Sequence, residues 1–281
     1  MKLLRYGAPG AEKPGMIDED GNIRDLSDYV TDIAGRDLDP AVLERIARLD
    51  PAALPLVGGS PRLGPCVAGT GKFICIGLNY SDHAAETGAK VPEEPIIFMK
   101  ASSAICGPND PIVIPRGSEK TDWEVELAVI IGKRAKYVSQ AEAFDYVAGY
   151  AVTNDVSERA FQLEHSGQWT KGKSCDNYGQ IGPWLVTKDE VPDPQNLRMW
   201  LTVNGEKMQN GSSSTMVFGV AKLVSYLSQF MSLHPGDVIS TGTPPGVGLG
   251  MKPPRYLKAG DVVELGIDGL GQQRQDVVDD Q

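Results

Sequence analysis

The feature that most constrains the fold is the segment 122–132, which reads Asp-Trp-Glu-Val-Glu-Leu-Ala-Val-Ile-Ile-Gly. From Val125 to Ile131 every residue except Glu126 is apolar, and such a run is typical of a strand buried on both faces. Glu124 and Glu126 stand two positions apart at its start. Because strand side chains alternate, both carboxylates are expected on one face. Burying two like charges unpaired costs several kcal/mol each, so the two acids fit either a divalent cation or a solvated strand end.

Composition limits the classes of protein that remain. The 281 residues include 32 Gly and 20 Pro, which favours turn-rich β structure, and the net charge of −10 argues against a nucleic-acid partner. No apolar run approaches the roughly 18 residues of a membrane helix, and we recognise no signal peptide at the N-terminus, so no membrane association is expected. The four cysteines form no Cys-x-x-Cys pair. We expect reduced thiols in a cytoplasmic protein.

The chain is expected to divide into a small N-terminal domain with its linker, residues 1–66, and a larger catalytic domain, residues 67–281. The first part contains a hairpin around Asp20-Gly21 and a helix that begins at Pro40 with Asp39 as its cap, followed by a stretch rich in proline and glycine. The second part is dominated by short strands separated by turns. The predicted class is therefore α+β and rich in β structure, with a barrel or roll and a few helices.

Three acids are candidates for binding a metal ion. Asp155 directly follows a predicted strand at 150–154, as Glu124 and Glu126 begin another. Three carboxylates with no Cys or His pair nearby favour a hard cation, Mg²⁺, Mn²⁺ or Ca²⁺. Such an ion would keep coordination positions for water or a bidentate substrate. Three separate surface acids would fit the spacing equally well.

His83 and Glu86 are three residues apart in a short predicted helix, close enough to hydrogen-bond. A carboxylate can hold an imidazole in the tautomer that accepts a proton from water. A lone histidine is more often a packed or capping residue, and this pairing is what favours a catalytic role.

Further polar residues are candidates for binding an anionic substrate. The segment 157–164 is predicted to be helical, and a helix that starts at Asp155 would place Arg159 and Gln162 on the same face. Lys173 follows Gly172 in a predicted turn, and with Arg159 it could neutralise developing negative charge. The loop 242–248 could offer backbone N–H groups and the Thr243 hydroxyl to a carboxylate. For any single lysine the simpler interpretation is a solvated side chain.

Taken together, these stretches resemble the fumarylacetoacetate hydrolase family. The matching motifs are Ile76-Gly77-Leu78-Asn79-Tyr80-x-x-His83-x-x-Glu86, Trp123-Glu124-Val125-Glu126-Leu127, Asn154-Asp155-Val156-x-x-Arg159-x-x-Gln162, Gly172-Lys173-Ser174 and Thr241-Gly242-Thr243-Pro244-x-Gly246-Val247-Gly248. They occur in the family's order and cover roughly residues 73 to 265.

The resemblance implies a mixed β-roll catalytic domain of the family's type, a small N-terminal domain, a bound Mg²⁺ or Mn²⁺ (with Ca²⁺ a substitute in crystals), and a homodimer. Its motif positions imply that Glu124, Glu126 and Asp155 bind the metal ion and that His83 and Glu86 activate water. They also imply that Lys173 meets the reacting substrate. The implied lining of the substrate pocket is Arg159, Gln162 and Thr243. Pro245 stands where many relatives carry lysine, which bears on substrate preference.

Segments 168–176 and 251–257 are similar to bacterial members that cleave 2,4-diketo-3-deoxy sugar acids, a branch that includes acylpyruvase-like enzymes. Our hypothesis is a metal-dependent hydrolase that cleaves a carbon–carbon bond in a 2,4-diketo acid to give pyruvate and a carboxylic acid. One alternative is a decarboxylase or lyase on the same metal site, such as an oxaloacetate decarboxylase or a ureidoglycolate lyase. Another is a non-catalytic binding module that the metal stabilises.

Overall fold

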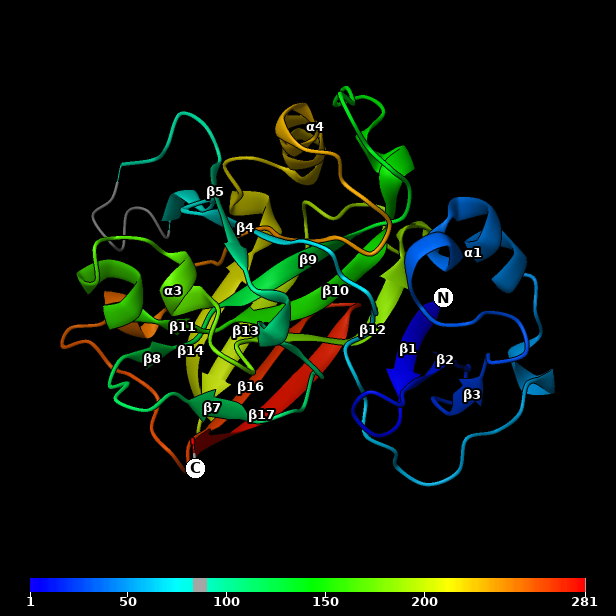
Figure 1. Ribbon diagram of the computed structural model, residues 1–281, viewed down its shortest axis with the longest axis horizontal. Helices are drawn as coiled ribbons and strands as arrows, with labels where there is room; N and C mark the ends of the chain where they lie inside the picture. Colours follow the sequence, from blue (N-terminus) through cyan, green and yellow to red (C-terminus); the bar gives the residue numbers. More distant parts are fainter. Residues whose placement is uncertain (83–89, 281) are drawn as a thin grey trace.

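Two mixed β-sheets pack against each other in the computed structural model, which describes residues 1–82 and 90–280 (Figure 1). Strands β9 and β10 of the large sheet contact β13, β16 and β17 of the smaller one. In spatial order the large sheet contains β3 (Ile23–Asp25), β2 (Lys13–Ile17), β1 (Lys2–Tyr6), β12 (Gly179–Thr187), β10 (Val147–Asp155), β9 (Val125–Ile131), β15 (Val238–Ser240), β4 (Phe73–Gly77) and β5 (Ile96–Lys100), with β6 (Ile105–Cys106) beside β12.

The smaller sheet has the spatial order β14 (Glu206–Ser212), β13 (Arg198–Val203), β16 (Val262–Ile267), β17 (Gly271–Asp279) and β7 (Ile112–Ile114). A separate pair joins β8 (Thr121–Asp122) to β11 (Ser157–Glu158). Most neighbours are antiparallel, while β15–β4, β12–β6 and β17–β7 are parallel. The arrangement confirms the predicted β-rich α+β class.

The helices are short and lie around the sheets (Figure 1). Within residues 1–82 and 90–280 the α-helices that can be bounded are α1 (Pro40–Ile46), α3 (Thr170–Lys173) and α4 (Val220–Phe230). The other helical turns there are η1 (Gly35–Leu38), η2 (Pro51–Ala53), η3 (Ser102–Ala104), η4 (Ala143–Tyr146), η5 (Ala160–Glu164, a π-helix), η6 (Lys188–Glu190), η7 (Ser213–Thr215) and η8 (Gly248–Gly250). Across the residues that the structure describes, no helix combines the length and apolar character needed to cross a membrane.

Strand β9 is buried on both faces, as its sequence predicts. Val125, Leu127 and Val129 point into the core between the two sheets. Ala128 and Ile130 point the other way, into a second core shared with the N-terminal segments. Because side chains alternate along a strand, the side chains of Glu124 and Glu126 point to the same side of the sheet as Ala128. They lie at the start of the strand, beyond the apolar residues of that second core.

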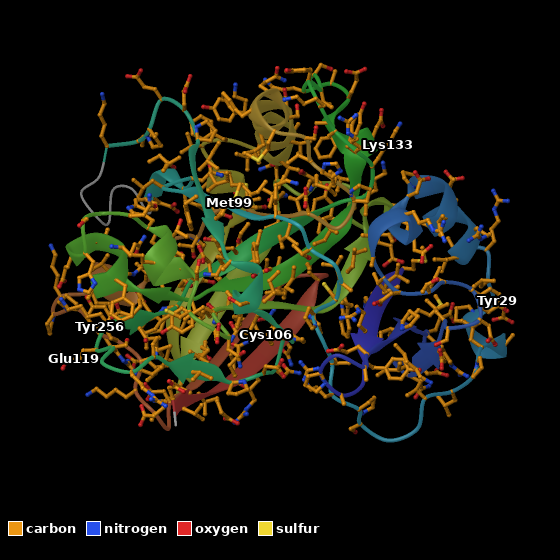
Figure 2. All side chains as sticks on the ribbon, in the orientation of Figure 1. Tyr29, Met99, Cys106, Glu119, Lys133 and Tyr256 are labelled. Atoms are coloured by element: carbon orange, nitrogen blue, oxygen red, sulfur yellow. The ribbon has the colours of Figure 1, made fainter. Side chains whose placement is uncertain are left out.

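The N-terminal segments extend the large sheet, since Leu3 of β1 pairs with Leu185 of β12. The predicted hairpin forms between β2 and β3, and α1 begins at Pro40 with the Asp39 side chain accepting from Ala41 N. In Figure 2 the exposed Tyr29 lies at the outer edge of this unit, whereas the buried Cys106 lies among the central strands. The domain boundary at residues 66 and 67 stays a prediction.

Two local predictions differ from the structure. The helix predicted over 157–164 is confirmed only from Ala160, where the π-helix η5 begins, because Asp155 ends strand β10 and Ser157 pairs with Asp122. The segment around Lys173 is the short helix α3, not a turn. It packs directly on the 158–162 backbone because Gly172 has no side chain: a Cβ there would lie 2.3 Å from Glu158 O.

Candidate active site

Strand pairing brings the three predicted acids together. Strand β10 runs antiparallel to β9 with Thr153 opposite Glu126, so Asp155, two residues on, comes to lie opposite Glu124. The backbone N–H of Asp155 donates to Glu124 O at 2.9 Å, a hydrogen bond that agrees with this register. Each of the three side chains offers a carboxylate oxygen within 4.8 Å of the others, and all three residues are buried.

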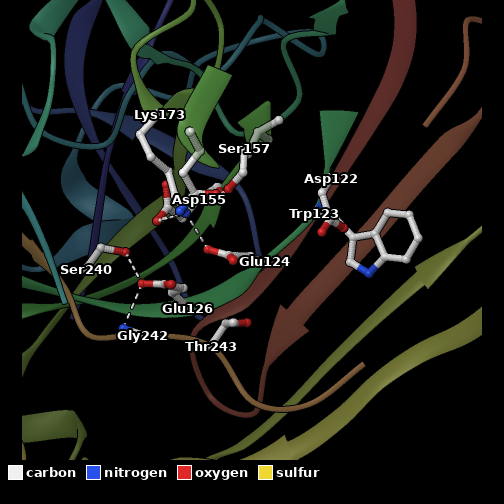
Figure 3. Close-up of polar contacts among 12 residues, drawn as sticks. Asp122, Trp123, Glu124, Glu126, Asp155, Ser157, Lys173, Ser240, Gly242 and Thr243 are labelled. Carbon is white, nitrogen blue, oxygen red and sulfur yellow. Dashed lines mark hydrogen bonds and ion pairs between the residues drawn. The ribbon is translucent and has the colours of Figure 1, made fainter. Parts of the chain in front are cut away.

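Buried cations surround this cluster. Lys173 Nζ donates to Glu124 Oε2 at 2.6 Å and to Asp155 Oδ2 at 2.8 Å (Figure 3). Lys100, at the end of β5, contacts Asp155 Oδ1 and donates to Val156 O at 2.9 Å. Arg159 Nη2 donates to Glu124 Oε1 at 2.7 Å. The acids that the sequence left without partners are thus compensated by cations from three other segments.

Glu126 has a different environment from the other two acids. Its Oε2 accepts from Ser240 Oγ at 2.5 Å and from Gly242 N at 2.8 Å (Figure 3). Its Oε1 accepts no hydrogen bond from any residue of 1–82 or 90–280. Burial, followed by repulsion from Asp155 and Glu124, raises the pKa of Glu126 well above its ordinary value, although Lys173 opposes this.

The two cations that face Glu124 stay charged. Burial disfavours the ammonium of Lys173, but attraction to Asp155 and Glu124 outweighs it and raises the pKa of Lys173 above its ordinary value. Burial likewise disfavours the guanidinium of Arg159, and Asp122 and Glu124 outweigh it and raise the pKa of Arg159. Both residues are therefore fixed positive charges in the range of pH where proteins work.

Two of the three acids, Glu124 and Glu126, line a pocket of about 190 Å³. Glu124, Glu126, Arg159 and Lys173 supply its charged lining, and Gln162 and Thr243 also line it. The rest of the described lining is apolar: Ile76, Gly77, Leu78, Phe98, Leu163, Trp169, Val247 and Leu249. Such a pocket, largely apolar with a few converging polar groups, is the usual form of a small-molecule site.

The polar side chains of the pocket differ in how many donors remain for a ligand. An ammonium has three N–H donors, and the described residues accept two from Lys173, so one is available for a ligand. Arg159 donates to Asp122, Glu124 and Gln162. Thr243 Oγ1 donates to Val125 O and accepts from Gln209 Nε2, both at 2.8 Å. Contacts of Arg159, Gln162 and Thr243 with substrate stay predictions.

The donor set fits a divalent cation. All three groups are carboxylates, the hard oxygen donors that Mg²⁺ and Mn²⁺ prefer, and Glu126 Oε1 has no competing donor among the described residues. Bonds from Ser240 and Gly242 orient Glu126, and bonds from Lys100 and Arg159 orient Asp155 and Glu124, which is the kind of support that metal ligands require.

The site also contains residues that the sequence analysis did not assign. Lys100 lies 55 positions before its partner Asp155, and its only sequence signal is a charge at the end of an apolar strand. Asp122 carries a clearer signal, because it stands two residues before Glu124 just as Glu124 stands two before Glu126. His83 and Glu86, the predicted water-activating pair, lie outside the described residues.

Comparison with known proteins places this site in a family. The family described as "Fumarylacetoacetate (FAA) hydrolase C-terminal" matches residues 72–278. The chain is 65% identical over 276 residues to a protein of Burkholderia multivorans named as a hydrolase, with 98% of both chains covered. A similar protein of Burkholderia cenocepacia is 64% identical over the same length.

Solved structures agree with the sequence match. The fumarylacetoacetate hydrolase of the psychrophile Exiguobacterium antarcticum superposes with a TM-score of 0.86 at 35% identity, and 100% of both chains is covered. The maleylpyruvate hydrolase of Sphingobium sp. SYK-6, solved in complex with manganese(II) ion and pyruvate, gives a TM-score of 0.82 at 29% identity, again with 100% of both chains covered. The chain therefore belongs to the fumarylacetoacetate hydrolase family.

Proposed function

We propose that this protein is a metal-dependent hydrolase that cleaves the carbon–carbon bond of a 2,4-diketo acid, giving pyruvate and a carboxylic acid. One observation carries the proposal: three buried carboxylates suited to a divalent cation lie together, and two of them, Glu124 and Glu126, line the same pocket as the charged Lys173. A related hydrolase of maleylpyruvate was solved with manganese(II) and pyruvate, which supports a 2-oxo acid as ligand.

Glu124, Glu126 and Asp155 would hold the ion, Mg²⁺ or Mn²⁺, and when bound it would supply Lewis-acid polarisation of the 2-oxo acid group. The remaining N–H of Lys173 would donate to the substrate oxygen on which negative charge develops. Arg159, held by three partners, would add a fixed positive charge to the same wall of the pocket. Gln162 and Thr243 would border the substrate.

The proposed reaction consumes one water molecule. His83, oriented by Glu86, would accept a proton from water as the oxygen attacks the 4-carbonyl carbon. The C3–C4 bond then breaks, its electron pair forms the enolate of pyruvate, and a proton returned to C3 gives pyruvate beside the free carboxylic acid. Lys173 would stabilise the enolate charge. The roles of His83 and Glu86 rest on their three-residue spacing and on the motif resemblance.

The substrate tail is proposed from motif similarity. That similarity favours 2,4-diketo-3-deoxy sugar acids or simple acylpyruvates, and Pro245 in place of the common lysine bears on the preference between them. We also expect a homodimer that works in the cytoplasm with a small anionic substrate. Light scattering of the purified protein tests the homodimer directly.

A panel of diketo acids tests the reaction. Loss of the diketo absorbance should require Mg²⁺ or Mn²⁺ and should stop on chelation. In ¹⁸O-labelled water, hydrolysis places the label in the released carboxylic acid, whereas decarboxylation or a lyase reaction does not. Oxaloacetate serves as the matched substrate for a decarboxylase. If pyruvate forms from oxaloacetate and from no diketo acid, the hydrolase proposal is wrong.

A further inference from the structure

Asp122 lies behind the pocket at the junction of three segments. Its carboxylate is fully buried, and it is not among the described residues that line the pocket. Oδ1 accepts from Trp123 N at 2.8 Å and from Gly248 N at 2.7 Å. Oδ2 accepts from Leu249 N at 3.0 Å and from Arg159 Nε at 2.8 Å. A buried carboxylate is costly unless compensated, and here four donors, one of them charged, provide the compensation.

Two of these bonds fix the pocket wall. Gly248 and Leu249 belong to η8, and Val247 and Leu249 line the pocket. The wall can approach Asp122 this closely only because residue 248 is glycine: a Cβ there would lie 2.8 Å from Asp122 Oδ1 and 1.9 Å from Arg255 O. The neighbouring Trp123 Nε1 donates to Gly246 O at 3.0 Å, so this segment is held at two points.

The bond from Arg159 Nε fixes the Arg159 side chain. Its Nε donates to Asp122, its Nη1 donates to Gln162 at 3.0 Å, and its Nη2 donates to Glu124 at 2.7 Å. Nη2 also pairs with Asp122 Oδ2 at 2.8 Å. A planar guanidinium held at Nε can present its other N–H groups in only one orientation. Asp122 therefore determines where Arg159 meets Glu124 (Figure 3 shows Asp122 and Glu124 on the same stretch of chain).

We propose that Asp122 is a positioning residue for this site: it neutralises and orients Arg159, and it anchors the Val247–Leu249 wall. With Asp122 in place, the positive charge of Arg159 is shared between two carboxylates. Without it, Glu124 alone would balance that charge, and Glu124 would become a weaker ligand for a divalent cation. The assignment rests on the proposed function, because it concerns the same metal and diketo acid site.

Asp122→Asn tests the assignment with almost no change in volume. The asparagine oxygen can still accept from one side, but its NH₂ group must face either Arg159 or the N–H groups of η8. Mn²⁺ binding without substrate is measured from the electron paramagnetic resonance of the free ion. We expect the affinity of Asp122→Asn for Mn²⁺ to fall by about tenfold or more, as for other residues that orient metal ligands.

Asp237→Asn is the matched control. Asp237 is also buried, accepts from Lys72 N at 2.9 Å and His234 N at 2.7 Å, and pairs with Lys72 Nζ at 2.6 Å, just before β15 and away from the pocket lining. Both substitutions should lower the melting temperature, but only Asp122→Asn should weaken Mn²⁺ binding. Unchanged Mn²⁺ affinity in folded Asp122→Asn, or equal weakening in the control, overturns the assignment.

A second variant covers the case in which Asp122→Asn does not fold. Arg159→Lys keeps the charge but cannot reach both Asp122 and Glu124 with a rigid fork. It should reproduce the loss of Mn²⁺ affinity, and where the double variant folds, the two effects should be less than additive. A normal Mn²⁺ affinity in Arg159→Lys overturns the assignment. If the wild-type protein binds Mn²⁺ but cleaves no diketo acid, the proposed reaction fails while the role of Asp122 in binding the ion stands.

Discussion

Lys100→Met should destabilise the metal-free protein far more than the same substitution at a partly exposed lysine such as Lys72. The Lys100 side chain is fully buried and makes two contacts, an ion pair with Asp155 Oδ1 and a 2.9 Å hydrogen bond to Val156 O. Methionine fills a similar volume, so little cavity forms. What is lost is the compensation of a buried carboxylate and of a buried carbonyl.

The magnitude follows from those two losses. Removing one partner of a buried ion pair typically costs about 3–5 kcal/mol, and a buried carbonyl left unpaired costs about 1–3 kcal/mol. Asp155 keeps its 2.8 Å hydrogen bond from Lys173, so the cost of losing the ion pair should lie near the lower end of its range. We therefore expect a loss of about 4–6 kcal/mol in the free energy of unfolding.

Urea unfolding monitored by circular dichroism measures this loss in the presence of a chelator. Lys72→Met is the control, because Lys72 pairs with a buried aspartate at 2.6 Å but is itself 23% exposed, and we expect about 1 kcal/mol there. Added Mn²⁺ should stabilise Lys100→Met more than the wild-type protein, since the ion restores positive charge beside Asp155. A loss below about 1 kcal/mol in Lys100→Met would refute the reasoning.

Three further predictions test other parts of the site and core. Lys173→Met should lose turnover while keeping or tightening Mn²⁺ binding, because the ammonium that holds Glu124 and Asp155 is gone; free-ion resonance and steady-state kinetics measure the two effects. Glu126→Gln should lose at least about tenfold in Mn²⁺ affinity yet unfold at an unchanged or higher urea concentration, since a buried charge with a raised pKa is removed. Burial raises the pKa of Cys66 and of Cys106 to about 12 from the ordinary 9.0. The unfolded chain therefore releases these protons first, stability should fall as pH rises from about 9 towards 12, and iodoacetamide at pH 8 should modify neither thiol in the native protein; mass spectrometry of the alkylated protein decides this.

The sequence determined the features that depend on neighbouring residues. The buried character of β9 and the common face of Glu124 and Glu126 follow from a two-residue period, which needs no knowledge of the partner strand. The cap at Asp39 and the hairpin around Asp20-Gly21 are equally local. The ordered motifs added the family, which the comparisons then showed.

Only the tertiary structure decided which distant groups meet. Asp155 lies opposite Glu124 because β9 and β10 pair in one particular register, and no periodicity within either strand specifies that register. Lys100 comes from β5, which pairs with β4 and not with β10, yet its side chain contacts Asp155. The short β8–β11 ladder overrides the helical pattern after Asp155. Local propensity is weak compared with long-range pairing and burial. The motifs therefore predicted Arg159 and Lys173 in the pocket, whereas the contact between Lys100 and Asp155 required the tertiary structure.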